Sequence, residues 1–161
     1  MSPTVAAFVG AGALVFFLMV IIFYVLVVIA GWKIFEKAGE PGWKALIPIY
    51  NLYIMFKIVG MAMWFWIMLA VSVGVEIVSV ILTGTSTDAA DPNNLNPFVV
   101  ILVCAEAILF LIVEIMYAVR TARAFGKGGG FAVGIFFLPN IFWLILGFGS
   151  AKYNKKVALK K

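Results

Sequence analysis

Four apolar runs dominate the sequence and constrain its fold more than any other feature. They cover residues 8–31, 59–82, 98–119 and 131–148. An α-helix rises about 1.5 Å per residue, so about 20 apolar residues cross the roughly 30 Å of hydrocarbon in a bilayer. The first three runs exceed that length, and the fourth is just sufficient. We therefore expect an integral membrane protein.

The composition supports this interpretation. Of the 161 residues, 65% are hydrophobic and 12% are charged, whereas soluble domains are about 45–50% apolar and about 25% charged. Only helices and closed barrels satisfy all backbone hydrogen bonds inside a membrane. We predict an all-α fold, in which residues 1–161 form a single bundle of four transmembrane helices.

All twelve Lys and Arg residues lie in three segments beside the apolar runs, at positions 33–57, 120–127 and 152–161. The loop at 83–96 contains two aspartates and no basic residue. Cytoplasmic loops of membrane proteins are enriched in Lys and Arg. This rule places the first two basic segments in the cytoplasm and the acidic loop and the N-terminus outside.

By the same rule, residues 32–58 and 120–130 as a whole are cytoplasmic. The C-terminal tail conflicts with the rule. If the fourth run crosses the membrane, the five lysines of the tail reach the outer face. The alternative is that the run breaks at Pro139-Asn140 and returns. Each half of the run would then extend only about 13 Å into the membrane. The irregular turn between the two halves would need shielding by protein. We therefore favour a crossing helix.

The net charge of +5 does not indicate a nucleic-acid partner, because such a partner requires basic residues clustered on a soluble surface. Arg120, Arg123 and Lys127 instead follow the third run, where a helix C-terminus meets the membrane surface. Positively charged side chains are favoured both at the C-terminus of a helix and at the cytoplasmic membrane surface. We expect these three side chains to contact lipid headgroups.

Residues 41–57 are neither fully apolar nor an ordinary loop. A Gly- and Pro-rich turn precedes a stretch that mixes Trp and Tyr with lysines. Such amphipathic rings prefer the level of the headgroups. We predict an amphipathic segment along the cytoplasmic interface, with these notable positions: Lys37, Gly39, Pro41, Gly42, Trp43, Pro48, Tyr50 and Asn51.

Residues 37–51, KAGEPGWKALIPIYN, resemble the signature of an uncharacterised family of small bacterial multi-span membrane proteins. A similar segment is fused to some signal peptidase I relatives. Leu138-Pro139 and residues 146–149 are also similar to the last span of that family. The resemblance implies a bacterial cytoplasmic membrane and four spans. It does not imply peptidase activity, because Ser2 has neither a partner lysine nor a following soluble catalytic domain.

Three carboxylates, Glu76, Glu106 and Glu114, lie inside the predicted spans. Ionisable side chains at membrane depth cost several kcal/mol and usually face the interior of a helix bundle. Antiparallel packing of the second and third spans would place Glu76 and Glu106 at similar depth. Each carboxylate is therefore a candidate functional group.

Hydroxyl groups accompany these carboxylates at helical spacing. Ser72 and Ser79 share a face with Glu76, and Tyr117 shares one with Glu114. Three interpretations remain open. The groups could form a proton or cation relay, because two carboxyls in one apolar site share a proton or hold a cation. They could instead join helices through hydrogen bonds, or pair with a cation on a partner subunit.

The sequence offers no catalytic residue and no metal site. Histidine is absent and Cys104 is the only cysteine, so the commonest general base and the usual transition-metal ligands are missing. We predict no cofactor, and a bound lipid or pigment is the alternative that the sequence leaves open. We expect a protein that is not an enzyme.

Two functions are compatible with these features. The first is a structural or accessory subunit, which would associate with other integral membrane subunits or with itself, and with the lipid bilayer. The alternative is a small proton- or cation-conducting carrier that uses the intramembrane glutamates. The two hypotheses differ in what they require of the carboxylates.

Overall fold

A computed structural model describes residues 3–83 and 96–159 of the chain, without the side chains of residues 3–10 and 83. Most of the predicted outer loop lies outside the described residues. The described part is helical and contains no strand. Its elements are α1 (Pro3–Lys37), the 3-10 helix η1 (Gly42–Leu46), α2 (Pro48–Ile58), α3 (Ala62–Thr83), α4 (Pro97–Ala124), α5 (Gly129–Phe137), α6 (Pro139–Phe148) and α7 (Lys155–Ala158).

Three of these helices are long and apolar enough to cross a membrane. They are the segments Ala11–Lys37 of α1, Ala62–Leu82 of α3 and Pro97–Ala124 of α4. They correspond to the first three apolar runs of the sequence. The all-helical class is thus confirmed, and the length and composition of these helices indicate a multi-pass membrane protein.

The fourth apolar run does not form one helix, so the predicted count of four transmembrane helices is not confirmed. The run divides at Leu138, whose φ of −134° and ψ of 58° lie outside the helical region. A residue before proline is disfavoured in the α conformation. Pro139 then begins α6, at a position where a missing N–H has no cost. The result is two short helices, α5 and α6.

The predicted interfacial segment also divides. It forms η1 and α2, which are separated at Ile47-Pro48, so one continuous amphipathic segment is not confirmed. The turn before η1 contains Gly39 with a φ of 79°, a conformation that L side chains rarely adopt. Gly42 packs directly against the Trp32 indole ring, and a Cβ atom there would overlap it.

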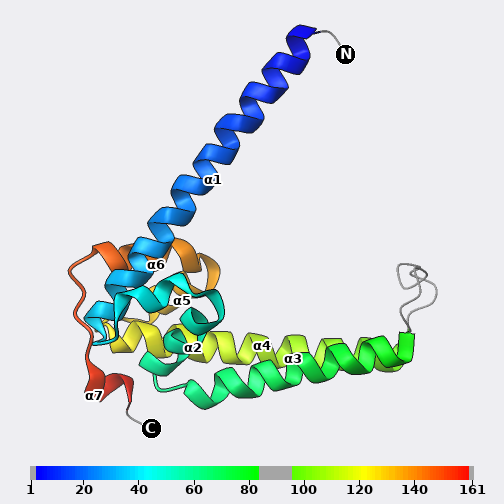
Figure 1. Cartoon of the computed structure of the whole chain (residues 1–161). Coiled ribbons are helices and arrows are strands. Elements are labelled where there is room, and N and C mark those ends of the chain that lie inside the picture. The colour runs from blue at the N-terminus through cyan, green and yellow to red at the C-terminus, as the bar shows by residue number, and fades with distance from the viewer. Residues whose placement is uncertain (1–2, 84–95, 160–161) are drawn as a thin grey trace.

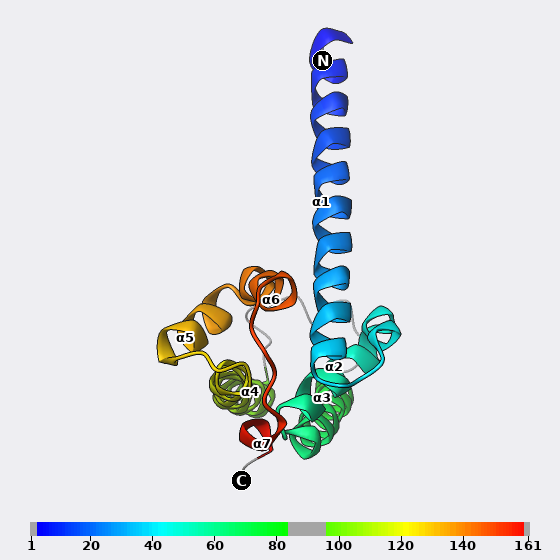
Figure 2. The same cartoon turned by 90° about the vertical axis from the view of Figure 1, so that its left-hand side faces the viewer.

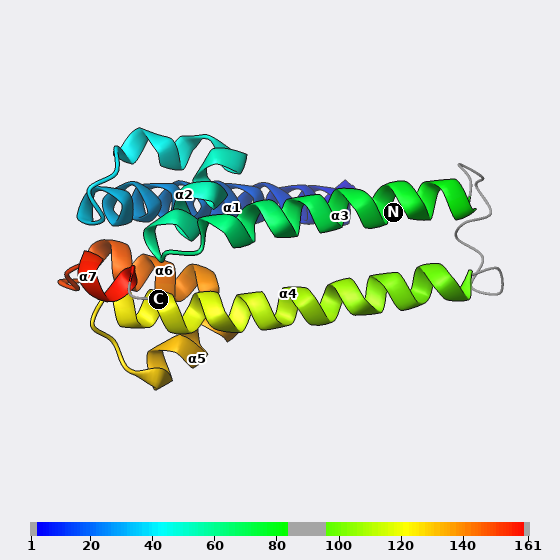
Figure 3. The ribbon, with the colours of Figure 1, turned by 90° about the horizontal axis from the view of Figure 1, so that it is seen from below.

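The short helices gather around one end of the molecule, and the long helices extend from it. Figures 1 and 2 show α1 standing clear of the rest along most of its length. Figure 3 shows α3 and α4 side by side, in agreement with their direct contact. The buried core lies where α1, α2, α4 and α6 meet, and it includes Ile34, Phe35, Ile54, Val113 and Leu146.

Helix α6 packs closely against the C-terminal part of α1. A Cβ atom on Gly147 would lie 2.6 Å from the Cα atom of Ala30, so only glycine permits this approach. The Lys37 ammonium group donates hydrogen bonds to the carbonyl oxygens of Leu146 (2.6 Å), Gly147 (3.0 Å) and Gly149 (2.7 Å). These bonds satisfy carbonyls that a helix end leaves without partners. The ends of α1 and α6 therefore lie together.

The segment after α6 returns to the ends of α2 and α4. The Asn154 backbone N–H donates to the Ala124 carbonyl at 2.8 Å, and the Tyr153 hydroxyl donates to the Ile58 carbonyl. Helix α7 then packs against α4. The C-terminal segment thus lies at the same end of the molecule as the C-termini of α1, α2 and α4.

The contact between Gly147 and Ala30 generates a prediction. We expect Gly147→Ala to lower the stability by about 1–3 kcal/mol, because the added methyl group must push α6 away from the α1 backbone. The measurement is the midpoint of thermal unfolding of the purified protein in mild detergent. Gly74→Ala in α3 is the control, because no atom lies within 4 Å of its Cβ position. An unchanged midpoint for Gly147→Ala would contradict the packing.

Candidate functional site

The three intramembrane carboxylates lie in different environments. Glu106 on α4 is half-buried and accepts a hydrogen bond of 2.7 Å from the Ser72 hydroxyl on α3. Glu76 on α3 is exposed and makes no hydrogen bond or ion pair with the described residues. Ser79 is half-buried on the same helix. The structure therefore brings Glu106 together with Ser72 and leaves Glu76 on the outer surface of the chain.

Glu114 lies two helical turns beyond Glu106 on α4 and is half-buried. Tyr117, one turn further, is 6% exposed, and its ring stacks on Phe56 of α2 with 5.3 Å between ring centroids. The hydroxyl oxygens of Tyr117 and Thr121 are buried, and neither has a hydrogen bond of good geometry within the described part of the chain. This part of α4 therefore places two buried hydroxyl groups next to the core.

A pocket of 320 Å³ lies between α2, α3 and α4. It brings the side chains of Ser72 and Glu114 into one apolar cavity. The residues that line it are Leu52, Phe56, Phe65, Met68, Leu69, Ser72, Phe110, Val113 and Glu114. The apolar members were not recognised as site residues in the sequence, because α2, α3 and α4 contribute them from separate apolar stretches.

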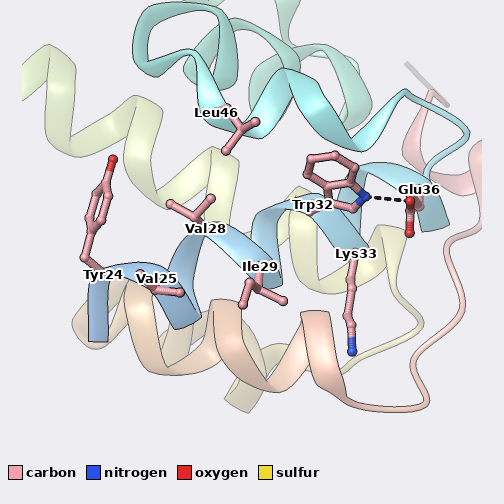
Figure 4. Close-up of a pocket in the computed structure, with 8 residues that line it drawn as sticks. All are labelled: Tyr24, Val25, Val28, Ile29, Trp32, Lys33, Glu36 and Leu46. Carbon is pink, nitrogen blue, oxygen red and sulfur yellow. Dashed lines mark hydrogen bonds between the residues drawn. The ribbon is translucent and has the colours of Figure 1, made fainter. Parts of the chain in front are cut away.

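A second pocket, of 670 Å³, lies between α1 and η1 (Figure 4). Trp32 and Glu36 stand at one end, where the indole Nε1 donates to the Glu36 carboxylate at 2.6 Å. Lys33 extends to the other side of α1 (Figure 4), and its ammonium group lies 4.5 Å from the centroid of the Phe148 ring. Leu46 forms the opposite wall. This pocket is an apolar groove at the basic end of the molecule.

The remaining candidate groups are metal-ligating and nucleophilic side chains. No group of three or more His, Cys, Asp or Glu side chains lies together there to hold a metal ion. Cys104 is exposed on α4. The chemistry that these residues offer is hydrogen bonding and ion pairing by single carboxylates.

The turn between α1 and α2 contains an ion-pair network that the sequence interpretation did not single out. Glu40 accepts hydrogen bonds from Lys44 at 2.6 Å and from Lys57 at 2.8 Å. Both ammonium groups lower the pKa of Glu40, with the bond from Lys44 contributing most. The spacing of four residues between Glu40 and Lys44 could have indicated their pairing. Lys57 is brought to them by the fold.

The other motif residues make contacts within the fold or mark the ends of its helices. Lys37 binds the end of α6, Pro41 precedes η1 and Pro48 begins α2. Tyr50 stacks on Trp43 with 6.4 Å between centroids. The Asn51 side-chain oxygen is buried without a hydrogen-bond donor in the described part of the chain.

The basic residues after α4's apolar stretch also lie at the end where the short helices gather. Arg120 donates to the Gly60 carbonyl at 3.2 Å. Arg123 is exposed, and Lys127 is exposed with its ammonium group 5.8 Å from the centroid of the Phe131 ring. Arg120 therefore has a partner within the chain, whereas Arg123 presents its charge to the surroundings.

The Glu40 network generates a pH prediction. Because its pKa is lowered in the folded protein, Glu40 contributes stability above the pKa of an unfolded glutamate, about 4.3, and loses it as the pH falls through the lower folded value. We expect Glu40→Gln to lower the thermal midpoint at pH 7 by at most about 3 °C. The difference should shrink below about pH 4 and in high salt, which screens exposed ion pairs. A difference in thermal midpoint between the wild type and Glu40→Gln that stays constant with pH would exclude this ion-pair contribution.

Comparison with known protein families gives one result. Residues 43–156, most of the chain, match a family described as a family of unknown function (DUF5684). No similar protein was found among the curated proteins or the solved structures. The match extends from η1 through α7 and so includes the pocket between α2, α3 and α4. The chain belongs to this family of unknown function, DUF5684.

Proposed function

We propose that the protein is a non-enzymatic structural or accessory subunit of the membrane, which associates with another integral membrane protein or with a second copy of itself. One observation carries this proposal: Glu76 lies within α3, exposed and without a partner in the described part of the chain. Intramembrane carboxyls face a bundle interior or a water-filled cavity. A second transmembrane helix packed on this face of α3 would supply that interior.

The position of Glu76 supports this argument. It lies seven residues before Thr83, the last residue of α3, which is roughly 10 Å along the helix axis. A side chain at that depth does not reach the headgroups easily, and a carboxyl without a partner in hydrocarbon costs several kcal/mol. A polar group from a partner helix would remove that cost.

Helix α1 offers a second surface for association. Residues 11–26 are all exposed, and burial within the chain begins only near Ala30. Figure 1 shows that this part of α1 has no neighbouring helix. A helix that is apolar on all sides is compatible with lipid and also with packing against a partner helix.

The arrangement of carboxyls favours association over conduction, the alternative function. A relay requires polar groups at hydrogen-bonding distances along a path across the membrane. Glu106 and Glu114 are eight residues apart on α4, about 12 Å along its axis. The pocket residues Phe110 and Val113 between them are apolar.

We further propose that the protein lies in a bacterial cytoplasmic membrane, with the N-terminus outside and residues 32–58 and 120–130 in the cytoplasm. Residues 129–148 would enter the membrane from the cytoplasmic side and return to it. The contacts of Lys37 with the end of α6, and of Asn154 with Ala124, support this topology. They gather the three basic segments at one end, so the tail then agrees with the positive-inside rule.

Cysteine labelling tests this topology. In a Cys104→Ser background, we expect Ser150→Cys and Gly128→Cys to react with an impermeant maleimide only after spheroplasts are permeabilised. Ser86→Cys in the predicted outer loop should react in intact spheroplasts and serves as the control. Labelling of Ser150→Cys in intact spheroplasts would instead support a fourth crossing.

Substitution of Glu76 tests the proposed association. We expect Glu76→Leu to weaken association about 3- to 30-fold, because a hydrogen bond between membrane helices contributes about 0.6–2 kcal/mol. Glu76→Gln keeps hydrogen-bonding capacity and should retain most of the association. The measurement is the associated fraction in mild detergent by native mass spectrometry.

The matched control is Ile81→Ala, because Ile81 is 74% exposed and lies about 140° around α3 from Glu76. The Ile81→Ala substitution should leave association unchanged.

In a Cys104→Ser background, cysteines at position 73 or 80 should form cross-links to the partner, because both positions lie on the same face of α3 as Glu76. Wild-type association by the Glu76→Leu protein, or a wild-type protein that is monomeric in mild detergent, would refute the proposal.

A further inference from the structure

The pocket between α2, α3 and α4 combines an apolar cavity with a carboxyl group. Its volume of 320 Å³ lies at the lower end of the range of about 300–1,000 Å³ for small-molecule sites. The rim residues Leu52, Leu69 and Phe110 are 51%, 41% and 45% exposed, so a ligand can enter from the surface. Val113 and Met68 at its base are 2% and 7% exposed.

Glu114 has no opposite charge within the described part of the chain. Neither ion pair there includes it, since Lys44 and Lys57 both bind Glu40. The nearest cation along α4, Arg120, donates to the Gly60 carbonyl. One turn from Glu114, the buried Tyr117 hydroxyl also lacks a well-formed hydrogen bond to the described residues. The pocket thus has an acidic group without the cation that would neutralise it.

Aromatic rings form much of the remaining wall. Phe56 and Phe65 lie with their ring centroids 6.2 Å apart, and Phe110 faces the same cavity from α4. The face of an aromatic ring attracts a cation, most strongly when water is excluded. Aromatic rings beside a single carboxylate therefore favour the binding of an organic cation with an apolar body.

Other ligand classes fit the pocket less well. A metal ion needs several oxygen, nitrogen or sulfur ligands, and no cluster of three acidic, His or Cys side chains exists in the described residues. An anion would meet Glu114 without a cation to bind it. A lipid tail would fill the apolar wall but would leave the carboxyl of Glu114 without a partner, at a cost.

We propose that this pocket binds a lipophilic organic cation, such as a quaternary or protonated amine with an apolar body. The Glu114 carboxylate balances the charge, and Phe56, Phe65 and Phe110 contact the apolar body. This site is separate from the proposed association surface, because Glu76 does not line the pocket. It goes beyond the subunit role, and the two proposals can fail independently.

Direct binding to the full-length purified protein tests the proposal. The probe is tetraphenylphosphonium, a lipophilic cation, measured by equilibrium dialysis against the protein in lipid nanodiscs. We expect saturable binding at one site per chain, and a loss of about tenfold or more in affinity for Glu114→Gln, which removes the charge but keeps the shape. Phe110→Ala should weaken binding several-fold, because one ring of the cation site is lost.

Two controls separate this site from non-specific partition. Glu36→Gln makes the same chemical change in the groove between α1 and η1, outside the pocket, and should bind the probe as the wild type does. Tetraphenylborate, an anion of the same shape, should show no saturable binding. The thermal midpoint of Glu114→Gln shows whether that variant is folded.

The outcomes that overturn the proposal are definite. Equal affinity of the folded Glu114→Gln and wild-type proteins for tetraphenylphosphonium would exclude the carboxylate as the charge partner. Equal binding of tetraphenylphosphonium and tetraphenylborate would show that the probes only partition into an apolar cavity. A lipid tail would then be the better candidate for the occupant. Neither result depends on whether the protein associates through Glu76, so the subunit proposal would stand or fall on its own test.

Discussion

The ammonium group of Lys37 binds three carbonyl oxygens at the end of α6, and the arrangement of the short helices depends on this contact. The last carbonyls of a helix have no partner within it, and hydrogen bonds from a charged donor are stronger than neutral ones. The close approach of Gly147 to Ala30 joins the same two helices further along. Because α6 is thus joined to α1 while α5 packs on α4, the chain between them must turn at Leu138.

The sequence predicted the three long helices correctly, because the length of an apolar run decides whether it can cross a bilayer. It did not predict the division of the fourth run, although Pro139 was identified as the point where a break would occur. A proline within an apolar run is compatible with either a kinked or a broken helix. Here the contacts that accompany the break come from Lys37 and Ala30, more than 100 residues earlier in the chain. Local sequence carries no signal for partners at that separation.

The polar groups of the candidate site stand out in the sequence, whereas their pairings and the apolar lining of the pocket do not. Helical spacing singled out Ser72, Glu76 and Glu106 as polar groups within the predicted spans. It placed Ser72 and Glu76 on one face, yet the structure pairs Ser72 with Glu106 and exposes Glu76. Residues four apart differ by about 40° around a helix, and the position of α4 against α3 decides which of them is covered. That position depends on the tertiary contacts of both helices, which no pattern within α3 encodes.

Glu76 and Glu114 lie in different environments, which the sequence could not distinguish. A carboxyl at membrane depth is retained when some group compensates its cost. For Glu106 that group is the Ser72 hydroxyl within the same chain. Glu76 is exposed on α3, where the proposed partner helix would supply its compensation, whereas Glu114 lines a cavity that the proposed small ligand would fill. In both proposals the surface on which the carboxyl lies sets the size of the partner: a helix for Glu76, and a compact cation for Glu114.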